Sequence, residues 1–244
     1  AIEKGNYDGN ATYMSGSMEL SNYVIRDWNR WGWGEITYDY GYTQSSNIGV
    51  ANLVQHYITG DELAAYFEKL GFGKKTGIEL QGEVSGQIEF KYDIEIANAS
   101  FGQGIRTTPI QHIQALTAIA NNGYLLKPTI VEKIVNPNTG EVVYQSKKQK
   151  GTKVASEKTV NHMKDLMAQV VSPDRTGSDF MLEGYDIIGK TDYLLTNQST
   201  MWYQNTFNVT SDDIMAAFST YFNRESNFTV EIYVNNELKL TQNG

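Results

Sequence analysis

The 244-residue sequence contains no cysteine, so it can form neither a disulfide framework nor a thiolate metal site. Positive charge is also scarce, because 20 lysines and arginines stand against 28 aspartates and glutamates and give a formal net charge of −8. Proteins that bind nucleic acids need clustered Lys and Arg side chains, which displace the counterions of the phosphate backbone. The cationic run at 147–150 lies among turn-forming residues and predicts a solvated loop. The composition therefore excludes nucleic acid as a partner.

Long apolar runs are missing as well. No stretch reaches the roughly 18 apolar residues that a membrane-spanning helix requires, and no signal peptide opens the sequence. We expect any membrane anchor to lie outside these residues. The segment Ala1–Gly5 predicts the last turn of a helix that glycine closes, and we expect the start of that helix to be missing.

Apolar residues at helical spacing predict four helices. Asp61 is the expected cap of the second helix, and Thr108, followed by Pro109, is the expected cap of the third. The expected helices cover residues 46–60, 61–70, 107–123 and 156–172.

Alternation with a period of two predicts strands. The expected strands form a hairpin, 131–135 and 141–144 around a turn at 136–140, and an antiparallel sheet of 187–191, 214–219 and 228–234. Helices come first and most strands last, so we predict an α+β fold with a helical part (1–185) packed on an antiparallel sheet (186–244). A sheet of three strands leaves a long unpaired edge, so we expect this domain to be incomplete in the chain.

Three short motifs place polar residues at the ends of these elements. Ser45, Ser46 and Asn47 stand where the first predicted helix begins, and alone they are explained by helix capping. Phe101–Gly104 precedes the third helix, and Lys190–Thr191 follows an apolar strand. A Ser-x-Asn motif, a long helical segment and then Lys-Thr on a strand is the order of motifs in penicillin-recognising serine enzymes.

Together the motifs resemble the transpeptidase domain of class B penicillin-binding proteins. The resemblance covers residues 1–191 and resumes near 211, and Ile25-Arg26-Asp27-Trp28 is similar to the division-associated branch found in Gram-positive cocci and their relatives. It implies a D,D-transpeptidase that cross-links peptidoglycan stem peptides ending in D-Ala-D-Ala and that β-lactams acylate. Such a protein acts at the outer face of the bacterial cytoplasmic membrane, with cell-division and cell-wall proteins as partners.

The resemblance also implies roles for the motif residues. Ser45 would take part in proton transfer, Asn47 would hydrogen-bond the substrate amide, and Ser46 would line the substrate site. Lys190 would supply positive potential. By the same match, Thr191 would bind the terminal carboxylate of the substrate.

Two further assignments complete the site that the resemblance implies. The backbone N–H of Tyr193 would contribute to the oxyanion hole. The segment Phe101, Gly102, Gln103 and Gly104 would give structural support near the cleft. Neither a metal nor an organic cofactor is implied, because this acyl transfer needs only side chains and backbone donors.

The sequence departs from the family in two places. The S-x-x-K motif, which carries the nucleophilic serine, occurs nowhere in the 244 residues, so we expect a preceding segment or a second chain to supply it. Asp192 stands where the family has the glycine of K-T-G, and residues 193–210 match the family poorly. A carboxylate at this position would crowd the site and repel a carboxylate ligand, so Asp192 predicts weak penicillin binding.

Two other functions are compatible with these residues. The first is a non-catalytic scaffold or binding module of the cell-wall machinery, which both departures favour. The second is a β-lactamase or a β-lactam sensor domain, which shares the order of motifs. No acidic residue in a loop clearly predicts activation of a deacylating water, which argues against the β-lactamase.

Overall fold

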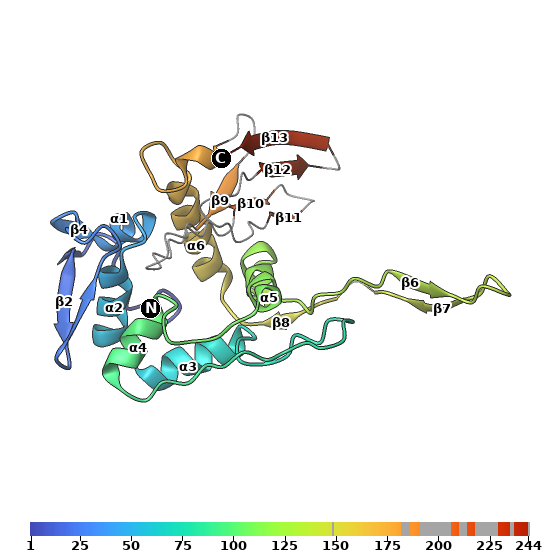
Figure 1. Ribbon diagram of the computed structural model, residues 1–244, viewed down its shortest axis with the longest axis horizontal. Helices are drawn as coiled ribbons and strands as arrows, with labels where there is room; N and C mark the ends of the chain where they lie inside the picture. The colour runs from blue at the N-terminus through green and yellow to red at the C-terminus, as the bar shows by residue number, and fades with distance from the viewer. Residues whose placement is uncertain are drawn as a thin grey trace. The chain divides into compact units, whose positions relative to one another are not determined.

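The computed structural model describes residues 1–147, 149–181 and 186–190, and the backbone of four further strands between 206 and 243. Contacts divide the chain into two compact units, Ala1–Tyr57 with His162–Gly244, and Ile58–Asn161. The described residues form helices and small antiparallel sheets that loops connect (Figure 1), so the predicted α+β class is confirmed. The predicted division at residue 185 stays a prediction.

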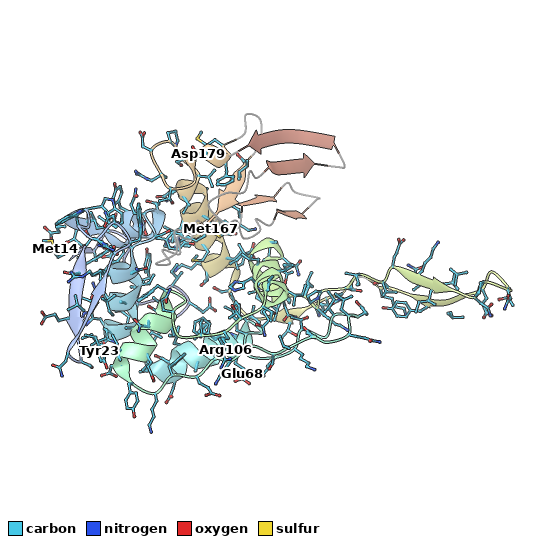
Figure 2. All side chains as sticks on the ribbon, viewed as in Figure 1. Met14, Tyr23, Glu68, Arg106, Met167 and Asp179 are labelled. Atoms are coloured by element: carbon cyan, nitrogen blue, oxygen red, sulfur yellow. The ribbon has the colours of Figure 1, made fainter. Side chains whose placement is uncertain are left out.

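In the first unit, two pairs of antiparallel strands come before two short helices in the sequence. β1 pairs with β4, and β2 pairs with β3. The bounds are β1 (Thr12–Met14), β2 (Ser17–Leu20), β3 (Tyr23–Arg26), β4 (Glu35–Thr37), α1 (Tyr38–Thr43) and α2 (Asn47–His56). Met14 and Tyr23, labelled in Figure 2, lie on these strands and are exposed.

α2 confirms the first predicted helix and its cap. Ser46 caps it by accepting a hydrogen bond from the N–H of Gly49 (3.0 Å). The helix packs against α1 and β3 and buries the apolar residues Ile48, Ala51 and Val54. It ends at His56, earlier than predicted, because the next helix already begins at Gly60.

Residues 1–6 form a hydrogen-bonded turn. The N–H of Gly5 donates to the carbonyl of Ile2 (3.0 Å), and the N–H of Asn6 donates to the carbonyl of Ala1 (3.2 Å). With Gly5 at φ 80°, this is the Schellman pattern that ends α-helices. The glycine therefore has the closing position that the sequence predicts for it.

Among its described residues, the second unit contains three complete helices, four short strands and the start of a further helix at Glu157. The bounds are α3 (Gly60–Lys69), α4 (Asp93–Ser100), α5 (Pro109–Ala120), β5 (Tyr124–Leu125), β6 (Lys133–Val135), β7 (Val142–Gln145) and β8 (Thr152–Lys153). α5 confirms the predicted helix with Thr108 as its cap. α4 was not predicted, because only eight residues form it and their apolar pattern is short.

The predicted cap of α3 is wrong. Thr59, not Asp61, caps this helix: its hydroxyl accepts from the N–H of Glu62 (3.2 Å), and the Glu62 carboxylate accepts from the N–H of Thr59 (2.8 Å). This reciprocal capping box satisfies two helix-terminal donors at once, which an aspartate two residues later cannot do. Asp61 lies in the first turn instead.

The predicted hairpin is confirmed as β6 and β7. In Figure 1 it projects away from α3, α4 and α5 of its own unit. No strand forms among the described residues 76–86, although Gln87 and Arg106 form an isolated bridge.

α6 (Glu157–Val170) confirms the fourth predicted helix and buries Val160, Met167 and Val170; Met167 is labelled in Figure 2. A short 3-10 helix, η1 (Ser178–Phe180), follows it. No helix among the described residues is long and apolar enough to cross a membrane.

The pairing of the last strands differs from the prediction. The strands are β9 (Ile187–Gly189), β10 (Thr206–Val209), β11 (Ile214–Ala217), β12 (Thr229–Val234) and β13 (Glu237–Asn243). β10, which was not predicted, lies between β9 and β11, and β12 pairs with β13. The sequence of β13 fits a strand, because Leu238 and Leu240 alternate with polar residues at the strand period of two.

Candidate active site

Ser45 occupies a strained backbone position between α1 and α2. The N–H of Ser45 donates to the carbonyl of Tyr42 (3.1 Å), and the N–H of Ser46 donates to the carbonyl of Gly41 (2.9 Å). This Schellman pattern ends α1, and Ser45 takes its left-handed position with φ 55°. Glycine usually holds that position, because a left-handed conformation costs other residues about 1–2 kcal/mol. The serine predicted to take part in proton transfer is therefore held in an unfavourable conformation.

Lys190 reaches Ser45 from the end of β9. Its Nζ donates a hydrogen bond to Ser45 Oγ and lies 5.5 Å from the centre of the Tyr42 ring, within the range of a cation–π contact. Burial raises the pKa of Tyr42, so its phenol is neutral at physiological pH. The structure thus brings together Ser45, predicted to take part in proton transfer, and Lys190, predicted to supply positive potential.

Ser46 is buried beside a carboxylate to which the sequence analysis gave no role. Its hydroxyl donates to Asp27 Oδ1 (2.9 Å), and the N–H of Ile48 donates to the same oxygen (3.1 Å). Asp27 Oδ2 accepts from the N–H of Gly16 (2.7 Å), and the Asp27 residue is only 2% exposed. In the sequence, Asp27 could have been noticed as a charged residue directly after the strand-like segment Tyr23–Arg26.

Asn47 and Trp28 connect the same turn to the end of β3. Asn47 Nδ2 donates to the carbonyl of Arg26 (2.9 Å), and Trp28 Nε1 donates to the carbonyl of Gln44 (2.8 Å). Asn47 is half-buried. Residues on both sides of Ser45 are therefore hydrogen-bonded to the segment 26–28.

The segment after α6 holds the end of α1. Thr176 Oγ1 donates to the carbonyl of Thr43 (2.9 Å), and the Arg175 guanidinium lies 4.7 Å from the centre of the Tyr40 ring. Two cations, Arg175 and Lys190, thus contact tyrosine rings of one helix. No motif in the sequence indicates the Arg175 contact, because it joins residues far apart in the chain.

The other predicted site residues fall elsewhere. Thr191 and Tyr193 lie outside the described residues. Phe101, Gly102, Gln103 and Gly104 belong to the second unit, where Phe101 ends α4 and both glycines have positive φ, 87° and 76°. Their predicted support of the cleft stays a prediction. Within the described part of the chain, no group of three or more His, Asp or Glu side chains is arranged to hold a metal ion.

The chain is similar to known proteins over most of its length. Residues 1–192 match the family described as the penicillin binding protein transpeptidase domain. Stage V sporulation protein D of Bacillus subtilis is 34% identical over 192 residues, which are 78% of this chain and 29% of that protein. Peptidoglycan D,D-transpeptidase FtsI of Escherichia coli is 29% identical over 194 residues, 78% of this chain and 30% of the relative. The chain thus spans less than a third of the length of these curated relatives.

Solved structures share the fold. The D,D-transpeptidase domain of a peptidoglycan glycosyltransferase from Eggerthella lenta superposes with a TM-score of 0.76 at 23% identity, over 90% of this chain and 58% of that one. Penicillin-binding protein 3 of Mycobacterium tuberculosis, solved as a complex with ampicillin, gives a TM-score of 0.75 at 24% identity, over 88% of this chain and 51% of that one.

Proposed function

Since the chain belongs to the family of penicillin-binding protein transpeptidase domains, we propose that it forms part of a serine D,D-transpeptidase of cell-wall synthesis. The substrate is a peptidoglycan stem peptide ending in D-Ala-D-Ala, and β-lactams acylate the enzyme as mimics of it. The observation that carries the proposal is the hydrogen bond from Lys190 to Ser45, which joins the Ser-x-Asn turn to the Lys-Thr strand.

The reaction breaks one peptide bond and forms another. A nucleophilic serine oxygen attacks the carbonyl carbon of the penultimate D-Ala, and the terminal D-Ala leaves as an amine that takes up a proton. The amine of a second stem peptide then attacks the acyl-serine, and the serine regains its proton. We assign the nucleophile to an S-x-x-K motif outside these 244 residues, on another segment or a second chain.

The geometry of Ser45 supports a role in moving the proton. An ammonium group only donates hydrogen bonds, so Ser45 Oγ is the acceptor of the bond from Lys190. The hydroxyl proton of Ser45 therefore points to another acceptor, and the leaving amine is that acceptor in the proposed reaction. The Lys190 charge stabilises negative charge that develops nearby, and it attracts the terminal carboxylate of the substrate.

The remaining roles complete the substrate site. Asn47 holds the amide of the substrate, Ser46 lines the site, Thr191 binds the carboxylate, and the N–H of Tyr193 donates to the oxyanion. Stem peptides are cross-linked outside the cell, so we place the domain at the outer face of the cytoplasmic membrane. Cell-division and cell-wall proteins are the proposed partners.

Intact mass spectrometry of the purified protein before and after incubation with a penicillin tests this function. We expect a polypeptide that carries S-x-x-K to gain the mass of one penicillin, and heat-denatured protein to gain none. An adduct that persists for hours indicates a transpeptidase or sensor, and rapid loss of the adduct indicates a β-lactamase. No adduct on any polypeptide would contradict the proposal and favour the non-catalytic scaffold.

A further inference from the structure

The turn that contains Ser45 needs an external restraint. Ser45 has φ 55° although it carries a side chain, and a left-handed residue of this kind persists only where its surroundings hold it. The residue that follows, Ser46, is both the cap of α2 and a hydrogen-bond donor to a buried carboxylate. This carboxylate, Asp27, takes no part in the proposed reaction.

We propose that Asp27 is a positioning residue that fixes Ser45 for proton transfer, and that it acts through Ser46. The proposal rests on the proposed transpeptidase function, because it assumes that Ser45 takes part in the reaction. Asp27 accepts hydrogen bonds from Ser46 and Ile48, one and three residues after Ser45.

Among the described residues, the three hydrogen-bond partners of the Asp27 carboxylate are all donors. Gly16 N–H, the Ser46 hydroxyl and Ile48 N–H share the two carboxylate oxygens at 2.7, 2.9 and 3.1 Å. A carboxylate accepts all three, whereas an amide of the same size offers one oxygen and turns an NH₂ group toward a donor. The site is therefore built for a carboxylate and not merely for a polar residue of that volume.

The position of Asp27 also matches the start of α2. The first N–H groups of a helix lack partners within it, and they carry partial positive charge. Ile48 N–H donates to Asp27, and Gly49 N–H donates to Ser46, which itself donates to Asp27. Rotating Ser45 toward an ordinary helical φ would pull Ser46 away from this network, so the network opposes that rotation.

The test measures acylation of the full-length protein by a fluorescent penicillin over a range of concentrations, which separates the initial binding constant from the acylation rate. We expect Asp27→Ala to lower the acylation rate about 100-fold, the effect of a roughly 1 Å misplacement, with initial binding changed by less than about threefold. Asp27→Asn keeps one acceptor and should recover part of the rate.

A double-mutant cycle separates positioning from a general loss of stability. If Asp27 acts through Ser46, Ser46→Ala should slow acylation much less in the Asp27→Ala background than in the wild type. Val160→Ala, at a fully buried position in α6, is the control: it should lower Tm without lowering the acylation rate. Multiplicative losses in the cycle, or an equal loss in Val160→Ala at a matched fall in Tm, would overturn the proposal.

A second measurement tests whether Asp27 holds the turn, even if the protein proves to have no transpeptidase activity. A wild type that forms no adduct contradicts transpeptidase activity, but hydrogen exchange of the Ile48 and Gly49 amides still reports the turn. We expect Asp27→Ala to speed exchange of both amides at least tenfold more than Val160→Ala does. Unchanged protection of these amides would show that Asp27 does not hold the turn.

Discussion

Lys190 donates a hydrogen bond to the Oγ of Ser45, a residue 145 positions earlier in the chain. The bond ties the end of β9, which is buried, to the turn between α1 and α2. Its two partners have different requirements. The lysine must carry a positive charge. The serine must accept the hydrogen bond while its backbone stays in the left-handed conformation. Each requirement gives a prediction.

Lys190→Ala should lower the rate of penicillin acylation by about 10²–10⁴-fold, the range of a lost acid–base or electrostatic group. Lys190→Arg keeps the charge but not the compact ammonium group, so it should recover only part of the rate. Lys74→Ala is the matched control, because Lys74 is an exposed lysine paired with Glu68. A wild-type rate for Lys190→Ala would remove Lys190 from the mechanism.

Ser45→Gly and Ser45→Ala should be equally slow in acylation, because both lack the hydroxyl. Their stabilities should differ, since glycine adopts φ 55° without strain and alanine does not. We expect Ser45→Gly to be more stable than Ser45→Ala by about 1 kcal/mol, measured by urea denaturation. Equal stabilities would show that Ser45 relaxes out of the left-handed conformation in solution.

Much of the fold was predictable where the signal is local. α2, α5, α6 and the β6–β7 hairpin follow from apolar spacing, caps and turn residues within a few positions of each element. The pairing of β9 with β10 was not predictable in this way, because pairing depends on residues distant in sequence. The same holds at the site: Ser45 and Lys190 could be named from motifs, but Asp27 gains its role only from contacts with Gly16, Ser46 and Ile48.

The third prediction concerns Tyr13. Its side chain lies so close to two glycines that a side chain at either position would collide with it. A Cβ added at Gly49 would lie 2.6 Å from Tyr13 Oη, and one added at Gly41 would also collide with that atom. Gly49→Ala should therefore destabilise the protein by about 1–3 kcal/mol, as overpacking of a core does. Combining Gly49→Ala with Tyr13→Phe removes the nearest atom and should restore part of this loss, whereas additive losses in the two variants would contradict the clash.

The loop at Thr76 gives a prediction about pH. The hydroxyl of Thr76 and the N–H groups of Thr76 and Gly77 donate to Glu83, which lowers the pKa of its carboxyl below the ordinary 4.5. A carboxyl with a lower pKa in the folded state contributes stability above pH 4.5 and loses it as the pH falls through the folded value. The free energy of unfolding should therefore fall less steeply below this pH in Glu83→Gln than in the wild type. Glu141→Gln, at an exposed glutamate of the hairpin turn, is the control, and parallel curves for all three proteins would contradict the prediction.

Asp192 lies outside the described residues, and its effect depends on charge and size together. A carboxylate beside Thr191 repels the carboxylate of a substrate or penicillin by about 1 kcal/mol at 4 Å in water, and by more where water is excluded. Asp192→Gly should therefore raise the second-order rate of acylation about fivefold or more. Asp192→Asn removes the charge and keeps the size, so a gain shared by both variants assigns the effect to charge, and a gain confined to glycine assigns it to crowding. Equal rates for the wild type and both variants would show that this position leaves the binding of the carboxylate unchanged.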